Sequence, residues 1–143
     1  MGAEPWSYFV PYQKDIPGAL EALKDREFRA GRYRRPDEHA PPPATIAEAV
    51  EQAQASGTRS VLDMIGLADT PHEPQSGLPH FCEVAPLRRE DLVALFGTTR
   101  PTRELIRARR DYLDLLERGE GIYIVVYAGD EPSELFFAGY SFD

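Results

Sequence analysis

The sequence lacks several features by which protein classes are recognised. It has a single cysteine, Cys82, which excludes an intrachain disulfide and fits a reducing compartment. No stretch approaches the roughly 18 apolar residues that a membrane-spanning helix requires, and the first residues do not join positive charge to an apolar run as a secretory signal does. These absences predict a cytoplasmic protein that does not associate with membranes.

No complete catalytic or cofactor-binding motif is present either. The sequence contains no glycine-rich dinucleotide loop, P-loop, zinc-protease motif, EF-hand loop or nucleophile elbow. With one cysteine it also lacks the paired-cysteine pattern of the zinc deaminases. We therefore predict no cofactor and no metal site. Whether the chain is an enzyme stays open, and the missing motifs favour a non-catalytic protein.

Lysine is scarce, because arginine supplies all but two of the 16 basic residues. Together with 13 prolines and many alanines, this bias is typical of a GC-rich bacterial genome. The composition is otherwise that of an ordinary globular protein, with 42% hydrophobic and 28% charged residues. A chain of 143 residues is expected to form one domain, residues 1–143, with a core of its own.

Negative charge is concentrated towards the end of the chain. Residues 111–143 contain eight acidic residues and one basic residue, a balance of −7, whereas the whole chain has a formal net charge of −8. Charge asymmetry of this kind is informative about partners rather than about the fold. It predicts a basic protein partner and disfavours nucleic acid, whose phosphates an acidic surface repels.

Residue patterns predict four helices and five extended segments. The helices are expected over residues 15–31, 45–57, 87–97 and 101–119, the last being the longest. The strands are expected over residues 6–12, 58–65, 81–84, 122–127 and 135–142. The order β-α-α-β-(β)-α-α-β-β predicts a single α+β domain with helix pairs on a mostly antiparallel sheet and a C-terminal β-hairpin. Residues 66–86 are expected to form a long proline-rich loop within it.

Two groups of arginines are candidate ligand-binding residues. Five arginines fall between residues 26 and 35, and another five between residues 100 and 110. A guanidinium binds phosphate or carboxylate bidentately, and aromatic rings beside it stack on bases. The predicted ligand-binding residues are Arg32, Tyr33, Arg34, Arg35, Arg103, Arg107, Arg110 and His80. The alternative interpretation is that both groups are solvated surfaces whose charges nearby acids balance.

His80 and Cys82 lie two positions apart, which on a strand directs both side chains to the same side. Such a pair suits a metal or a histidine–thiolate couple, but a zinc site needs three or four ligands. A buried cysteine that packs as a small hydrophobe is the favoured interpretation. Asp63 is either an acid on the solvent side of an alternating strand, which is favoured, or a buried acid paired with an arginine.

Three functional hypotheses follow from these patterns. The leading one is a non-catalytic protein-interaction module, of an immunity or regulatory type, in which acidic residues around aromatic anchors recognise a basic partner. In charge and size alone, the chain resembles toxin-neutralising immunity proteins. The second is an enzyme or binding protein for an anionic small molecule, such as a nucleotide or a phosphorylated metabolite, held by the arginines. The third is a homodimer formed through an exposed edge of the terminal hairpin.

Overall fold

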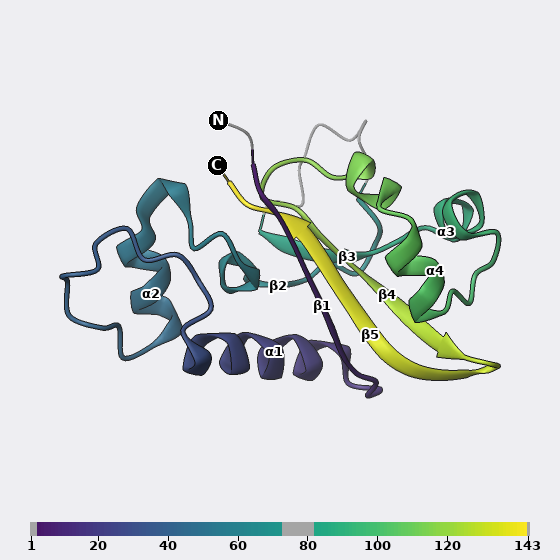
Figure 1. Cartoon of the computed structure of the whole chain (residues 1–143), viewed down its shortest axis with the longest axis horizontal. Coiled ribbons are helices and arrows are strands. Elements are labelled where there is room, and N and C mark those ends of the chain that lie inside the picture. Colours follow the sequence, from purple (N-terminus) through teal and green to yellow (C-terminus); the bar gives the residue numbers. More distant parts are fainter. Residues whose placement is uncertain (1–2, 73–81, 143) are drawn as a thin grey trace.

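A five-stranded β-sheet forms the centre of the computed structural model, which describes residues 3–72 and 82–142. Its spatial order is β1-β5-β4-β3-β2 (Figure 1), with β1 Pro5–Pro11, β2 Gly66–Leu67, β3 Glu83–Pro86, β4 Gly121–Ala128 and β5 Glu131–Tyr140. The α-helices are α1 Ile16–Ala30, α2 Ile46–Ala53, α3 Arg89–Phe96 and α4 Arg103–Ala108. The 3-10 helices are η1 Gln54–Ser56, η2 Val61–Asp63 and η3 Asp111–Leu115. The predicted α+β class is confirmed.

The sheet is mixed in direction. β5 pairs antiparallel with β1 on one side and with β4 on the other, and these are the three longest strands. The two short strands pair in parallel, β3 with β4 and β2 with β3. The expectation of a mostly antiparallel sheet therefore holds for the long strands, to which β3 and β2 add a parallel edge. The connection between β3 and β4 is long enough for a parallel crossover because it contains α3, α4 and η3.

The terminal hairpin forms the centre of the sheet rather than an edge. Its strands meet at a turn around Gly129, whose φ of +64° costs glycine no strain. β1 covers the outer side of β5, and β3 covers the first part of β4. Near the turn, the Tyr127 amide donates to the Pro101 carbonyl at 2.9 Å. Little of the hairpin backbone is therefore left unpaired for a second chain. The homodimer stays a prediction, and one formed by strand pairing would use the edge strands β1 or β2.

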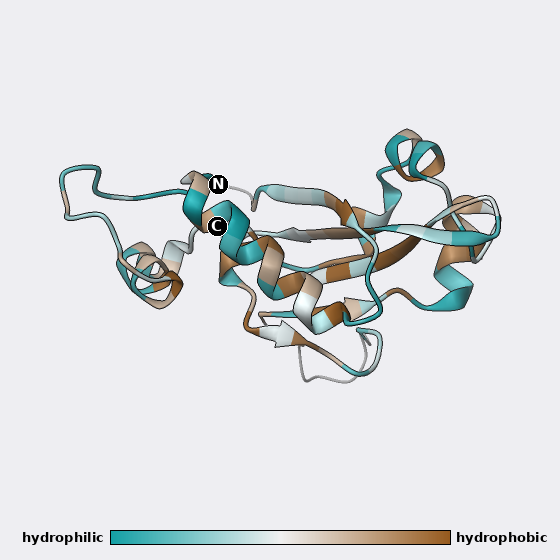
Figure 2. Ribbon diagram, turned by 90° about the horizontal axis from the view of Figure 1, so that it is seen from below, coloured by the Kyte–Doolittle hydropathy of each residue, from teal (hydrophilic) through white to brown (hydrophobic). Residues whose placement is uncertain are grey.

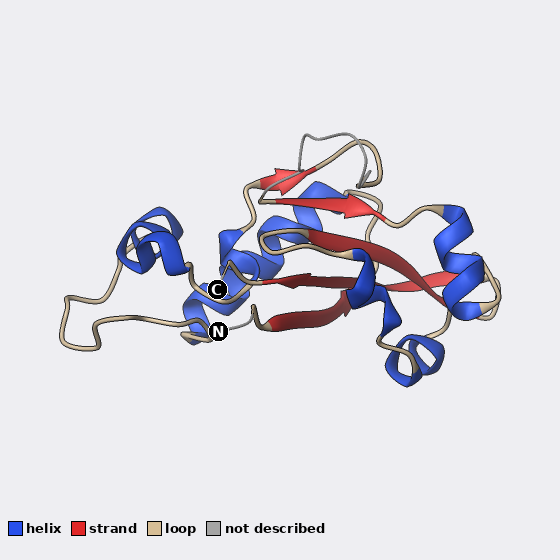
Figure 3. Cartoon of the chain, turned by 90° about the horizontal axis from the view of Figure 1, so that it is seen from above, coloured by secondary structure: helices blue, strands red, loops and turns tan. Residues whose placement is uncertain are grey.

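Both faces of the sheet are covered, which explains why the hairpin strands are apolar on both sides. Phe136 and Phe137 are successive residues of β5 and therefore point to opposite faces. Phe137 belongs to the same core as Leu23 of α1, whereas Phe136 packs with Tyr112 of η3 and Ile106 of α4. Figure 2 shows the hydrophobic residues gathered along the strands, and Figure 3 shows helices on both sides of the sheet.

The helix starts predicted at residues 15 and 45 are confirmed, whereas α2 ends at Ala53, before the predicted residue 57. The Asp15 carboxylate accepts a hydrogen bond from the Gly18 amide at 3.0 Å, and the Thr45 hydroxyl accepts one from the Glu48 amide at 3.1 Å. The Glu48 carboxylate in turn accepts from the Ala44 amide at 2.7 Å, so that Thr45 and Glu48 together satisfy two backbone amides at the start of α2. α1 and α3 each end at a glycine with positive φ, as predicted: Gly31 and Gly97.

The strand predicted over residues 58–65 is wrong, because this segment folds into the 3-10 turn η2. The Ser60 hydroxyl caps the turn by accepting from the Leu62 amide at 3.2 Å. The Asp63 carboxylate accepts from the amide and the hydroxyl of Thr58, each at 2.8 Å. Local bonds of this kind give the backbone an alternative to a strand. Asp63 is only 4% exposed, so the favoured solvent-facing interpretation is also wrong, and its carboxylate accepts from Thr58 rather than from an arginine side chain.

The single long helix predicted over residues 101–119 is also wrong. It divides into α4 and η3, with Arg109 between them in an extended conformation (φ −129°, ψ 122°). The break turns Tyr112 into the core, where its ring meets the edge of the Phe136 ring at a centroid distance of 5.4 Å. Burial of this aromatic ring outweighs the helix propensity of the surrounding arginines and leucines, which is favourable but small per residue. α1 is consequently the longest described helix.

The segment predicted as one long loop, residues 66–86, contributes β2 and β3 at its two ends. Part of the strand predicted over residues 81–84 falls within β3, while Phe81 and His80 lie outside the described residues. None of the helices in the described part of the chain is both long enough and apolar enough to cross a membrane.

Candidate functional site

The two arginine groups lie on opposite faces of the sheet and do not meet in one pocket. The first group occupies the C-terminal half of α1 and the segment after it, on the face that α1 covers. The second group lies in and around α4, on the other face (Figure 1). A ligand site that draws on both groups at once is therefore not formed.

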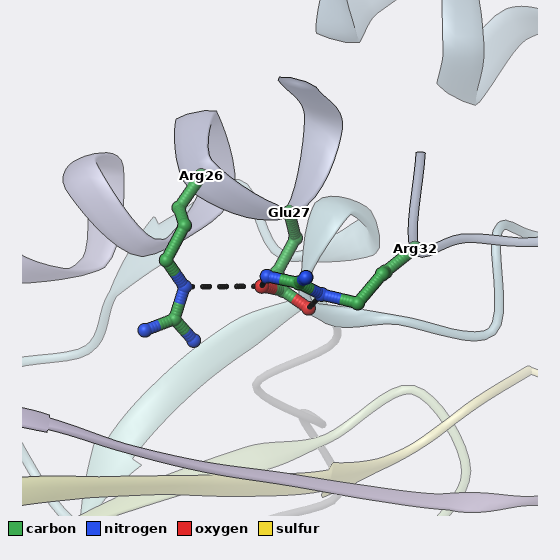
Figure 4. Close-up of polar contacts among 3 residues, drawn as sticks. All are labelled: Arg26, Glu27 and Arg32. Carbon is green, nitrogen blue, oxygen red and sulfur yellow. Dashed lines mark hydrogen bonds and ion pairs between the residues drawn. The ribbon is translucent and has the colours of Figure 1, made fainter. Parts of the chain in front are cut away.

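Most of the first group is neutralised by acids of α1. Glu27 is 2% exposed, and its carboxylate accepts two hydrogen bonds from Arg32, at 2.7 and 3.0 Å, and one from Arg26 at 3.1 Å (Figure 4). Hydrogen bonds from Arg32, with a smaller contribution from Arg26, hold the pKa of the Glu27 carboxyl below its usual value, although burial acts in the opposite direction. Arg29 pairs with Asp25 at 3.0 Å on the exposed side of the helix. Arg32, one of the predicted ligand-binding residues, thus serves to compensate a buried acid.

The remaining residues of this group follow α1 in the chain. Tyr33 stacks on Phe28 with a centroid distance of 5.9 Å, so its ring is part of an internal aromatic pair. Arg34 and Arg35 are half-buried, and neither forms an ion pair with a described residue. Of the predicted residues in this half of the site, Arg34 and Arg35 alone retain an uncompensated charge.

The second group is largely neutralised by the acidic C-terminal stretch. Three of its arginines reach carboxylates there: Arg100–Asp130 at 3.7 Å, Arg103–Glu134 at 3.5 Å and Arg109–Asp111 at 2.9 Å. Arg107 and Arg110 are exposed on the surface of this region. The two charge features that stand out in the sequence, the second arginine group and the acidic stretch, thus compensate each other in the fold.

This mutual compensation leaves few acids of residues 111–143 available to a partner. Glu120 is 6% exposed, and its carboxylate accepts from the Glu117 amide at 2.8 Å. His72 lies against the same carboxylate, with Nδ1 at 3.3 Å from it, while Nε2 donates to the Gly121 carbonyl at 2.7 Å. Among the described acids of the stretch, three form no ion pair with a described residue: Asp114, Glu117 and Glu131.

Two of these acids border an open hollow of about 480 Å³ beside η3. The hollow lies where η3 and the loop after it meet the chain just before β1 and the end of β5. Its lining consists of Ala3, Leu113, Asp114, Leu116, Glu117, Arg118 and Tyr140. Leu113, Leu116 and Tyr140 are wholly or partly buried and form the apolar part of its lining, whereas Asp114 and Glu117 are exposed. We call this feature the acidic hollow.

Cys82 and Asp63, also singled out by the sequence, lie near each other at one end of the sheet. Cys82 has a positive φ of 63°, and its amide donates to the Gly119 carbonyl at 2.8 Å. Burial raises the pKa of the Cys82 thiol, and the negative charges of Asp63 and Glu83 raise it further. A thiol held protonated is a poor nucleophile and metal ligand. Within residues 3–72 and 82–142, no three His, Cys, Asp or Glu side chains are arranged to hold a metal ion.

Sequence reasoning identified the charge groups but missed how they combine. Tyr140 was one aromatic residue among many, and nothing in the sequence places it beside Asp114, because one ends β5 and the other lies in η3. The chain matches no protein-family model, and comparisons with curated proteins and with solved structures find no similar protein. A functional interpretation therefore depends on the surfaces described above.

Proposed function

We propose that this chain is a non-catalytic interaction protein, of a regulatory or immunity type, that binds a basic protein partner through the acidic hollow. The observation that carries the proposal is that two exposed carboxylates without an ion pair to a described residue, Asp114 and Glu117, line the same hollow as Tyr140 and two leucines. A lysine or arginine side chain fits such a place, because its aliphatic stem packs on apolar surface while its charged end meets a carboxylate.

The charges of the neighbouring residues also favour a basic partner at the acidic hollow. Most other acids of the C-terminal stretch are held by arginines or by His72, so Asp114 and Glu117 form a local excess of negative charge. Among the described residues that line the hollow, Arg118 is the one base. Charge complementarity of this kind speeds the encounter of two proteins and rejects partners of the wrong sign.

The proposal is tested by affinity capture from the native host at low ionic strength, with each captured protein identified and then purified. The wild-type chain is compared with a double variant of the hollow, Asp114→Asn with Glu117→Gln. The matched control is Asp130→Asn with Glu131→Gln, which makes the same change in charge at the exposed hairpin turn, at the opposite end of β5. Titration calorimetry with the purified partner at two salt concentrations then measures the affinity.

We expect a partner with a basic surface whose affinity falls as salt increases, since exposed charges are screened at higher ionic strength. The hollow variant should lose at least about tenfold in affinity, while the hairpin-turn control keeps the wild-type value. Capture of the same protein by both variants with equal affinity would contradict the proposal, as would an acidic partner.

A further inference from the structure

Arg34 and Arg35 differ from every other arginine of the first group in having no acid beside them. Arg26 and Arg32 share Glu27, and Arg29 pairs with Asp25. Arg34 and Arg35 form no ion pair with a described residue, although both are half-buried. The nearest acids in sequence, Asp37 and Glu38, are exposed and do not reach either guanidinium.

Each of the two guanidiniums also has a buried nitrogen that lacks an acceptor. Nη1 of Arg34 and Nε of Arg35 are buried and have no hydrogen-bond partner among the described residues. Buried donors in folded proteins are nearly always bonded, and a buried charge without a counter-charge is costly. These donors therefore point to an acceptor that the described residues do not supply.

The segment that carries the two arginines is held in place by other contacts. The Arg34 amide donates to the Thr58 carbonyl at 2.8 Å, which fixes this residue to the loop before η2. Arg35 Nη2 donates to the Ala40 carbonyl at 2.8 Å and closes residues 35–40 into a turn. The backbone at Arg34 and the guanidinium of Arg35 are thus positioned before any ligand arrives, which lowers the entropy that binding would cost.

We propose that Arg34 and Arg35 form a binding site for a phosphate group of a small molecule. Two guanidiniums carry a charge of about +2, which a phosphate monoester, with a charge of about −1.5 to −2 at neutral pH, balances more fully than a single carboxylate does. The planar fork of donors suits phosphate oxygens. The site lies on the α1 side of the molecule and is separate from the acidic hollow, so it requires nothing of the proposed protein partner.

The test is titration calorimetry of the full chain with inorganic phosphate, at an ionic strength kept constant with sodium chloride. Acetate serves as the monovalent comparison, and adenosine monophosphate tests whether the phosphate is preferred as part of a nucleotide. The variants are Arg34→Gln and Arg35→Gln. Arg107→Gln is the matched control, because it removes the same charge from an exposed arginine on the opposite face. Arg34→Lys keeps the charge but removes the planar fork.

We expect saturable phosphate binding by the wild-type chain, tighter than acetate binding and unchanged in the Arg107→Gln variant. Loss of one charge-assisted contact should weaken binding by about tenfold or more in each glutamine variant, and Arg34→Lys should fall between them and the wild type. Far-ultraviolet circular dichroism establishes that each variant is folded. Binding of adenosine monophosphate as tight as or tighter than phosphate agrees with the proposal. No saturable phosphate binding by the wild-type chain, or equal weakening by Arg107→Gln, overturns it.

Discussion

The guanidinium of Arg103 lies over the ring of Phe9, with its central carbon 4.6 Å from the ring centroid. The same side chain reaches the Glu134 carboxylate at 3.5 Å. Phe9 belongs to β1 and Glu134 to β5, so one side chain of α4 contacts two neighbouring strands. We infer that Arg103 fixes α4 to the sheet at its β1 edge.

Replacement of Arg103 by alanine should lower the free energy of unfolding by about 1 kcal/mol, because it removes a cation–π contact and a partly exposed ion pair. Urea unfolding followed by circular dichroism measures the change. Arg107→Ala, an exposed arginine of the same helix, should change stability by less than about 0.5 kcal/mol. Equal effects of the two substitutions would show that the contact with Phe9 contributes nothing.

Gly139 is expected to tolerate no side chain. A methyl group added there would lie 2.6 Å from the Glu120 carbonyl oxygen and would collide with the Trp6 ring. Gly139→Ala should therefore destabilise the protein by about 1–3 kcal/mol, the usual cost of overpacking. Gly66→Ala is the control, because nothing lies within 4 Å of the added methyl group. A thermal melt in which the two variants behave alike would contradict this account of the Trp6 packing.

Glu27 should stabilise the fold in a pH-dependent manner. Its pKa is lowered below the ordinary value of 4.5 in the folded protein, chiefly by Arg32. Its contribution is therefore fully present above pH 4.5 and is lost as the pH falls through the lowered pKa. Glu27→Gln should cost about 2 kcal/mol at pH 7 and less under more acidic conditions. Urea unfolding at a series of pH values tests this, with the exposed Glu21→Gln as the control.

Asp63 should show the opposite dependence on pH. Burial raises its pKa above the ordinary value of 3.8, although hydrogen bonds from Thr58 partly offset the effect. The folded protein thus binds this proton more tightly than the unfolded chain, and stability falls as the pH rises from about 3.8 through the raised pKa. Asp63→Asn, which cannot ionise, should remove this decline from the curve of unfolding free energy against pH. Parallel curves for the two proteins would show that Asp63 ionises as freely in the folded state as in the unfolded one.

The parts of the fold that the sequence predicts well are those with local signals. Asp15, Thr45 and Gly31 mark helix ends because the groups they satisfy are a few residues away. The many β-forming residues between positions 58 and 65 wrongly predicted a strand. Ser60 and Asp63 accept hydrogen bonds from nearby amides and so stabilise a turn, which a pattern of hydrophobic residues does not reveal. The break at Arg109 depends on a contact between Tyr112 and a strand more than 20 residues away in sequence.

The binding surfaces depended even more on distant contacts. The sequence identified Arg103 and the acidic stretch as separate features, and the fold joins them through Glu134. The sequence also placed Arg32 and Arg34 in one group. In the fold, Glu27 neutralises Arg32, whereas Arg34 has no acid beside it. Composition counts charges, whereas function depends on which of them remain without a counter-charge after folding.

The bonds between Glu4 and Ser141 have a mechanical consequence. The Glu4 amide donates to the Ser141 hydroxyl at 2.8 Å, and the Ser141 amide donates to the Glu4 carbonyl at 2.9 Å, so the two ends of the chain lie together at one end of the sheet. A force that pulls these ends apart acts across the antiparallel pair of β1 and β5, and it loads their hydrogen bonds one after another, beginning at Pro5 and Tyr140. The hydrogen bonds between β1 and β5 would therefore break in sequence rather than all at once, as they would in shear. The first part of the sheet to open under tension is β1.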